Sequence, residues 1–139
     1  MNSPQNIVQY LYKNDAYSQW LGIEIIEVKN GYCKLKMKVR KEMLNGFKIT
    51  HGGISYSLAD TALAFASNTH GKKCISMETS ISHIECVQDG DCLTAVSKEL
   101  SKTEKTALYL ITIFNQNKQE VAYFKGTVYR TSKDWEIHE

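Results

Sequence analysis

The sequence predicts an α+β fold in which a curved antiparallel β-sheet wraps one long helix. Three observations support this prediction. Residues 53–70 are the longest helical segment, and Gly71 is placed to end it. Two short extended segments joined by Asn30-Gly31 come before this helix, and four longer extended segments come after it. Placing the helix over one face of an antiparallel sheet is the economical arrangement of these elements.

Before the long helix, we expect a short helix, a β-hairpin and a loop. The short helix covers residues 4–18, with Ser3 as its N-cap, Pro4 at its first position and a break or bend at Asn14-Asp15. Alternating polar and apolar residues around the Asn-Gly turn predict the hairpin. The two hairpin strands and the loop are assigned to residues 23–28, 32–39 and 40–51.

After the long helix, the extended segments have the β-branched and aromatic composition that is typical of strands. The alternation is imperfect between Leu108 and Ile111, which indicates that both faces of the sheet are partly covered and that the protein is an oligomer. Residues 132–139 are expected to form a flexible tail. The four predicted strands are residues 74–85, 92–102, 105–115 and 121–131.

Length and composition fit a single domain over residues 1–139, with an N-terminal helical segment at residues 1–20. Hydrophobic residues make up 42% and charged residues 23% of the chain, as in ordinary globular proteins. The net charge of +2 is too small to indicate a nucleic-acid partner. No apolar run approaches a membrane span and no secretory signal is visible, so we expect no membrane partner and a cytoplasmic location.

The chain has four cysteines, and none of them forms a C-x-x-C pair. Such pairs are typical of zinc knuckles and redox dithiols, so neither is expected. Free thiols in a reducing compartment are the expected state. The four are Cys33, Cys74, Cys86 and Cys92.

A glycine-hinged loop that leads into the long helix carries the strongest functional signal. Asp60 is a lone carboxylate on a helical segment made otherwise of Leu, Ala, Phe and small polar residues. A carboxylate is costly to desolvate there unless it has a function or a partner, and no cation lies three or four positions away. The helix start at Gly52 offers free backbone N–H groups, which suit developing negative charge. Together they indicate half of an active site.

The order of elements and a set of short motifs match a known family. The motifs are Asn14-Asp15-Ala16, Leu21-Gly22-Ile23, Leu44-Asn45-Gly46, His51-Gly52-Gly53, Leu58-Ala59-Asp60-Thr61-Ala62 and Gly90-Asp91. With them the chain resembles the hotdog-fold acyl-CoA thioesterases, most closely the phenylacetic-acid-degradation (PaaI-type) branch. The resemblance implies homodimers joined sheet edge to sheet edge and often paired into homotetramers. It also implies an active site at the dimer interface, with CoA along the subunit boundary, and aryl-acetyl or medium-chain acyl groups.

The same resemblance implies roles for individual residues. Asp60 matches the acidic catalytic residue, Gly52 the glycine whose backbone N–H polarises the thioester carbonyl, and Asn45 the polar loop residue near the reacting centre. No metal is implied, and no cofactor other than the coenzyme A that is part of the substrate. The residues expected to contact the substrate or its CoA portion are His51, Gly53, Ser67, Lys102, Lys105 and Thr106.

Thioester hydrolysis needs an attacking group and a hydrogen-bond donor for the resulting oxyanion. The Asp60 carboxylate and the backbone N–H groups at the helix start can supply them. The carboxylate either activates water as a general base or attacks the carbonyl directly, and the sequence leaves both open. Gly52 and Asp60 are eight positions apart, which is about 12 Å along a straight helix. One carbonyl cannot easily reach both in one subunit. The spacing therefore favours a site shared between two chains.

Plainer interpretations stand beside these roles. Asp60 could be an ordinary paired helix residue, the two glycines could be hinges, and Asn45-Gly46 is a common turn. His51 fits a loop histidine that buttresses the glycines better than an acid or base. Two other functions also remain open: a non-catalytic acyl-CoA-binding protein, and a hotdog acyl-thioester hydratase.

The chain departs from the family after the long helix, where Glu85 and Cys86 replace an Arg-Pro pair. This changes the charge expected near the phosphates. His83 and Cys86 are three positions apart, so on a strand they would face opposite sides and form no nucleophile pair. An apolar acyl pocket could be lined by Phe47, Tyr56, Leu63 and Phe65, although the same residues could equally be core.

Overall fold

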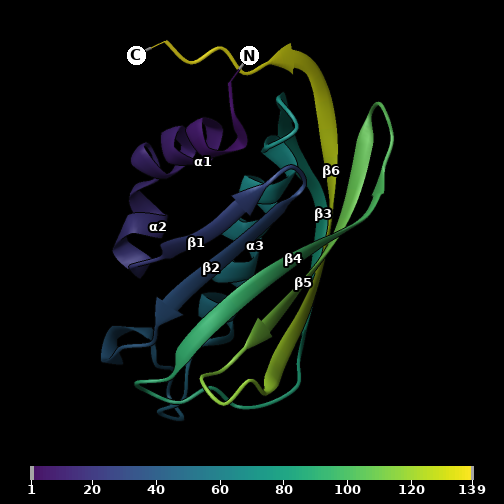
Figure 1. The fold of residues 1–139 in the computed structure, drawn as a ribbon. Helices are drawn as coiled ribbons and strands as arrows, with labels where there is room; N and C mark the ends of the chain where they lie inside the picture. Colours follow the sequence, from purple (N-terminus) through teal and green to yellow (C-terminus); the bar gives the residue numbers. More distant parts are fainter. Residues whose placement is uncertain (1, 139) are drawn as a thin grey trace.

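The computed structural model describes residues 2–138 and shows a six-stranded antiparallel sheet curved around a long helix (Figure 1). The strand order is β1-β2-β4-β5-β6-β3. This confirms the predicted α+β hotdog architecture. Met1 and Glu139, the ends of the predicted domain, lie outside the described residues. The elements are α1 (Pro4–Lys13), α2 (Ala16–Leu21), β1 (Glu24–Lys29), β2 (Tyr32–Lys38), η1 (Lys41–Met43), α3 (Gly52–Asn68), β3 (Lys72–His83), β4 (Cys92–Lys102), β5 (Thr106–Phe114) and β6 (Glu120–Asp134).

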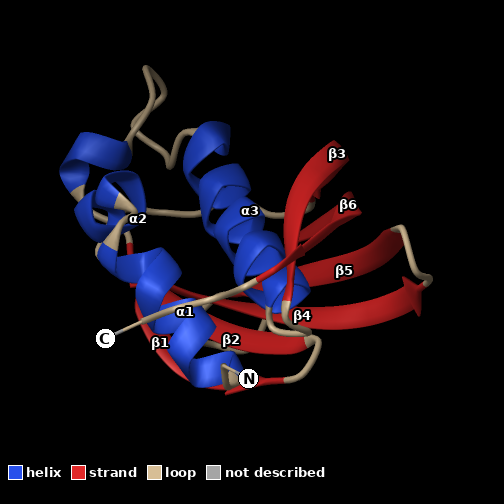
Figure 2. Cartoon of the chain, turned by 90° about the horizontal axis from the view of Figure 1, so that it is seen from above, coloured by secondary structure: helices blue, strands red, loops and turns tan. Residues whose placement is uncertain are grey.

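The N-terminal segment forms two helices rather than the single helix predicted for residues 4–18. Ser3 caps α1 by accepting a hydrogen bond from Asn6 N–H, and α1 ends at Lys13 with Asn14 as its C-cap. Asp15 then caps α2 by accepting from Ser18 N–H at 3.0 Å. Two capping residues in succession turn the expected bend into a complete break. Seen from above, α1 and α2 lie beside α3 on one side of the sheet (Figure 2).

The face of α3 opposite Asp60 is apolar and completely buried, and on it Phe65 packs against Tyr12 of α1. Leu58, Ala62 and Phe65 are each at most 1% exposed. The helix approaches the sheet closely because β6 has Gly126 opposite Leu63: a Cβ at Gly126 would be 2.5 Å from Leu63 Cδ2. This packing fixes the position of α3, and so of every functional residue that it carries.

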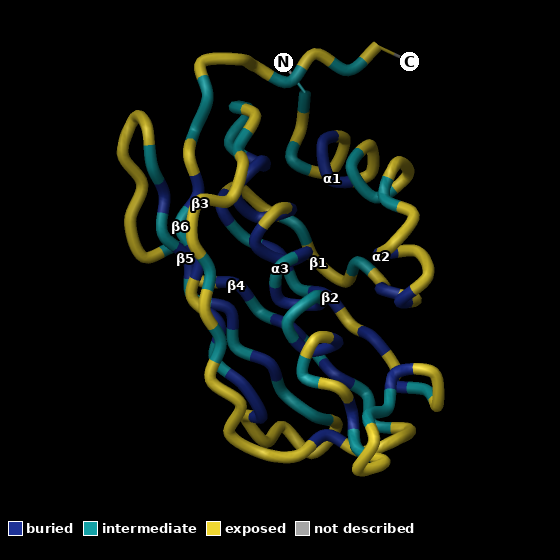
Figure 3. Tube along the Cα trace, turned by 180° about the vertical axis from the view of Figure 1, so that it is seen from behind, coloured by how far each residue is buried: buried dark blue, intermediate teal, exposed yellow. Residues whose placement is uncertain are grey.

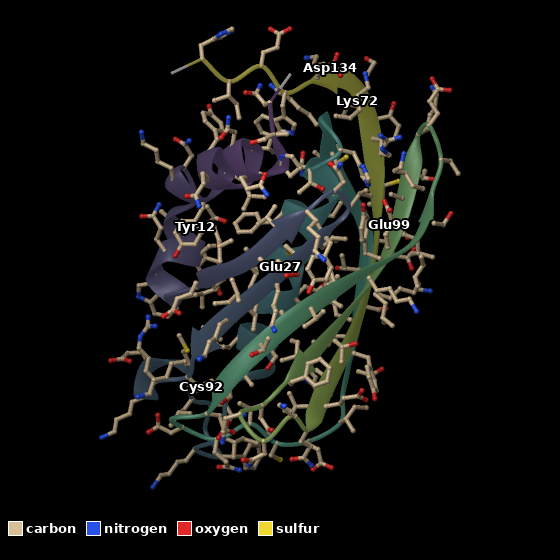
Figure 4. The ribbon with its side chains drawn as sticks, in the orientation of Figure 1. Tyr12, Glu27, Lys72, Cys92, Glu99 and Asp134 are labelled. Atoms are coloured by element: carbon tan, nitrogen blue, oxygen red, sulfur yellow. The ribbon has the colours of Figure 1, made fainter. Side chains whose placement is uncertain are left out.

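The last strand is longer than predicted, ending at Asp134 rather than residue 131. Lys72 at the start of β3 pairs with Asp134 at 2.8 Å, as the two labelled side chains show (Figure 4). Beyond the strand, Trp135 N–H donates to Gly71 O at 2.8 Å, and its indole N–H donates to Asn68 Oδ1 at 2.9 Å. Residues 132–134 therefore belong to the sheet and not to the predicted tail.

The two edges of the sheet differ. On the β1 edge, Gln5 of α1 donates to Val28 O at 3.0 Å, and α1 packs beside that strand. On the opposite edge, β3 pairs only with β6 within residues 2–138. Ile75 and Met77 on β3 are 63% and 61% exposed, and Figure 3 shows this strand largely unburied. An open strand edge with apolar side chains is a template for pairing with another chain.

Candidate active site

The start of α3 presents a backbone N–H to an open cleft. His51 is the N-cap, and its Nδ1 accepts from Gly53 N–H at 2.9 Å, while its carbonyl accepts from Ile54 N–H at 2.9 Å. No partner for Gly52 N–H is found in the described part of the chain. The cap thus satisfies the neighbouring amides and leaves Gly52 N–H free to bind a ligand. The buttressing role expected for His51 is confirmed.

Asn45 lies in the same cleft as Gly52, as expected for a residue near the reacting centre. Its Oδ1 accepts from Phe47 N–H at 2.9 Å, so the side chain also holds the loop in shape. The cleft has a volume of about 300 Å³. It is lined by Asn45, Ile49, Thr50, Gly52, Ser55, His83, Ile84, Glu85, Cys86 and Val87.

Asp60 is half-buried and unpaired. Within residues 2–138 its carboxylate makes no hydrogen bond or ion pair. Burial raises the pKa of the Asp60 carboxyl above its ordinary value. It lines a small pocket of about 60 Å³, between α3 and the β3 edge. The pocket residues are Asp60, Leu63, Ala64, Ser67, Cys74, Ser76 and Val128.

The structure separates the two halves of the predicted site within one chain. Gly52 and Asn45 share the cleft at the helix start, whereas Asp60 and Ser67 share the small pocket farther along. Between them runs an open stripe of α3 that neither the sheet nor the N-terminal helices cover. On this stripe Gly53 and Ala64 are exposed and small, so another helix could approach closely.

Ser67 lies in the Asp60 pocket, but its own side chain is almost completely buried. Its hydroxyl donates to Ala64 O at 3.3 Å within the helix. Ser67 and Asp60 therefore line the same pocket, but the Ser67 hydroxyl already donates a hydrogen bond to a backbone carbonyl.

Three of the six residues expected to contact the substrate or its CoA portion lie away from the start of α3. They belong to the β4–β5 hairpin, which projects at the end of the molecule opposite the loop before α3 (Figure 1). The turn is closed by Thr103 N–H donating to Thr106 O at 2.7 Å, and Arg130 donates to Thr103 O at 2.6 Å. Neither pocket of the candidate site includes the three, which are Lys102, Lys105 and Thr106.

One argument from the sequence is wrong. His83 is the last residue of β3, so Cys86 lies beyond the strand and alternation no longer applies. Both residues line the Gly52 cleft, together with Glu85. Local alternation of residues does not predict this, because the end of β3 is set by its pairing with β6.

The predicted acyl-pocket residues divide into several groups. Phe65 is core and Phe47 is 88% exposed, and neither lines the Gly52 cleft or the Asp60 pocket. Leu63 lines the Asp60 pocket, although it is otherwise buried. Tyr56 is half-buried, and its hydroxyl contacts Thr79 on β3.

Two further observations concern the whole described chain. Across residues 2–138, no group of three or more His, Cys, Asp or Glu residues could hold a metal ion. None of the helices in this range is long and apolar enough to cross a membrane. All four cysteines are free thiols.

Comparisons with known proteins identify relatives along most of the chain. A putative esterase of Archaeoglobus fulgidus is 43% identical over 131 residues, covering 94% of this chain and 85% of that protein. The acyl-coenzyme A thioesterase PaaI of Escherichia coli is 38% identical over 120 residues, covering 86% of each. The solved structure of E. coli PaaI, from the phenylacetic acid degradation operon, superimposes with a TM-score of 0.92, at 35% identity over 94% of this chain and 95% of that one.

A more distant solved structure, a Streptococcus mutans protein bound to acetyl-CoA, has a TM-score of 0.79 at 25% identity, over 81% of this chain and 91% of that one. The model of the thioesterase superfamily matches residues 47–122, which include Gly52, Asp60 and all of β3. With a match over more than half its length and relatives well above 30% identity, the chain belongs to the thioesterase superfamily.

Proposed function

We propose that this protein hydrolyses acyl-CoA thioesters at a site shared by two copies of the chain. The observation that carries the proposal is the unpaired, half-buried Asp60 on the open stripe of α3. A carboxylate left without a partner in this position costs free energy, so a functional role explains it better than a structural one. The relative named acyl-coenzyme A thioesterase supports the reaction class.

The geometry supports a dimer formed through the β3 edge. Tyr56 is midway between Gly52 and Asp60 on α3, and its hydroxyl contacts Thr79 on β3. A two-fold axis near this contact would pair β3 with its copy in antiparallel register centred on residues 79–80. It would also run the two α3 helices in opposite directions, with Gly52 of one copy facing Asp60 of the other. The open stripe of small residues would let the two helices approach.

The reaction can then be written for the shared site. Water, oriented by the Asp60 carboxylate, attacks the thioester carbonyl carbon, and the carboxylate accepts the water proton. The carbonyl π electrons move to oxygen, and the Gly52 N–H of the other copy stabilises this oxyanion. Collapse breaks the C–S bond, and the Asp60 proton returns to the departing thiolate to give free CoA. Direct attack by Asp60, through a mixed anhydride, is the second route.

The same dimer would bring cations to the CoA portion. Reversing the direction of β3 moves the β4–β5 hairpin of the second copy to the end of the sheet where Gly52 lies. Lys102 and Lys105 would then approach from that side, where phosphates need positive charge. The acyl group is proposed to be aryl-acetyl or medium-chain, consistent with the phenylacetic acid operon of the E. coli relative. We place the reaction in the cytoplasm, where CoA esters are made and used.

A thiol-release screen tests the proposal directly. Phenylacetyl-, hydroxyphenylacetyl-, benzoyl- and straight-chain acyl-CoA esters are offered to the wild type and to Asp60→Asn, and free CoA is measured. Turnover of at least one ester by the wild type, lost in the variant, is the expected result. Retained binding of acyl-CoA without CoA release would instead favour a non-catalytic binding protein. Hydration of crotonyl-CoA without hydrolysis would favour a hydratase.

A further inference from the structure

His83 stands against the helix start that carries the free amide. A Cβ built on Gly52 would be 3.1 Å from His83 Nε2 and 3.4 Å from Cε1. The edge of the imidazole thus occupies the space beside the Gly52 α-carbon. Because Gly52 N is bonded to this carbon, an oxygen that accepts from Gly52 N–H on the side of the ring can also meet the imidazole.

The imidazole is available to a ligand. In the part of the chain that the structure describes, neither ring nitrogen of His83 has a hydrogen-bond or ion-pair partner. The backbone is fixed all the same, because His83 pairs with Ala122 of β6 in the sheet. An exposed ring on a fixed strand end can turn toward the cleft that it lines with Gly52 and Asn45.

We propose that His83 is a second hydrogen-bond donor to the thioester carbonyl oxygen, acting beside Gly52 N–H. This role rests on the proposed thioesterase function and deepens it. The carbonyl oxygen gains negative charge when water adds, and a side-chain N–H aimed at it stabilises the transition state more than the ground state. No proton is transferred by His83: Asp60 takes and returns it, and the imidazole N–H only donates a hydrogen bond.

The alternative for His83 is a nucleophile pair with Cys86, which lines the same cleft. No contact between the two side chains is found among the described residues, and Cys86 is exposed in the loop after β3. Glu85 lines the same cleft and would form an ion pair with a protonated His83 imidazole, but such a pair makes no covalent bond to the substrate. The close approach of the ring to Gly52 therefore favours a donor to the substrate over a base for the thiol.

The test compares three substitutions at His83 with a control on the same strand. His83→Phe keeps the ring without N–H, His83→Gln keeps an N–H on a shorter arm, and His83→Ala leaves space for added imidazole. Ser82→Ala, the exposed preceding residue, is the matched control. Steady-state hydrolysis of the best ester is measured, with circular dichroism melting to verify folding.

The loss of one oxyanion donor predicts a fall in kcat of about 100-fold or more for His83→Phe and His83→Ala, with KM within about threefold. His83→Gln retains more activity than His83→Phe. Millimolar imidazole restores part of kcat to His83→Ala but not to Asp60→Asn, and Ser82→Ala resembles the wild type. A purely structural histidine would not respond to imidazole.

Three outcomes overturn the inference. If the wild type is active and the Phe and Ala variants keep kcat within about threefold, His83 has no role in the step while the thioesterase function stands. If Cys86→Ala abolishes turnover and added imidazole does not restore activity to His83→Ala, His83 acts as a base for the Cys86 thiol instead of as a donor to the substrate. A wild type without activity on any ester overturns the proposed function itself, and this role with it.

Discussion

The two faces of α3 carry opposite kinds of residues. The face opposite Asp60 is apolar and buried, with Leu58, Ala62 and Phe65 in the core. The open face has Asp60, unpaired and half-buried, between the exposed small residues Gly53 and Ala64. One face holds the fold together and the other leaves polar groups unsatisfied. Stability and the proposed function therefore depend on different residues of one helix. Substitutions on each face can test this.

Phe65→Ala should give the largest effect, and only on stability. Removing a fully buried aromatic side chain leaves a cavity, with an expected loss of about 3–5 kcal/mol in the free energy of unfolding. Urea unfolding measures this loss. Hydrolysis per folded molecule should change little, since Phe65 faces away from both pockets. A variant that loses turnover while keeping its stability would break the division between the faces.

Asp60→Asn should show the reverse pattern. We expect turnover to fall by at least about 100-fold, as is usual when an acid–base group is removed. The melting temperature should stay the same or rise, because the amide removes a partly desolvated charge. Asp60→Ala is the companion variant and should lose activity to a similar extent. Wild-type turnover in either variant would remove Asp60 from its role.

Gly126→Ala probes the boundary between the two faces. The added methyl group would press on Leu63, which packs in the core and also lines the Asp60 pocket. Overpacking of this kind costs about 1–3 kcal/mol. Gly46→Ala is the matched control, because nothing lies within 4 Å of its Cβ position. Equal stability of the two variants would show that the close contact between α3 and β6 is not needed.

The smallest expected effect is a pH dependence of stability. Burial raises the pKa of Asp60 in the folded protein, so the folded state holds this proton more tightly than the unfolded chain does. The wild type should therefore lose stability relative to Asp60→Asn as pH rises from the unfolded pKa, about 3.9, to the higher folded value. Above that window the difference is constant. Urea unfolding of both proteins at acidic and neutral pH measures it.

Much of the framework follows from local sequence. The Asn30-Gly31 hairpin and β4 over residues 92–102 are found where the patterns place them, whereas α3 covers residues 52–68 and ends at a Thr69 cap, before the predicted stop at Gly71. These features depend on turn chemistry and periodicity, which act over a few residues. The contact of His51 with the two glycines was expected from the sequence, but its role as the N-cap of α3 was not predicted.

Other features depend on contacts between distant segments. The extension of β6 to Asp134 depends on Lys72, and the place of His83 beside Gly52 depends on where β3 meets α3. Neither is visible in a window of neighbouring residues. The separation of Gly52 and Asp60 in one chain follows from their spacing of eight positions on a helix, whereas the joining of the two by a second copy belongs to our proposal.

The central claim is that each site takes Gly52 from one copy and Asp60 from another, and mixing two inactive variants tests it. Gly52→Pro removes the backbone N–H at a position where proline suits the helix start, because His51 has extended backbone angles of −59° and 134°. Gly52→Ala, which keeps the N–H, is its control. Asp60→Asn supplies the other defect.

Each variant alone should be inactive, and the two are unfolded together and refolded as a mixture. If the site is shared, a mixed dimer has one intact and one doubly defective site. Statistical mixing then restores about a quarter of wild-type activity. If both groups act within one chain, no site in any mixture is intact, and activity that stays at the level of the separate variants would contradict the account.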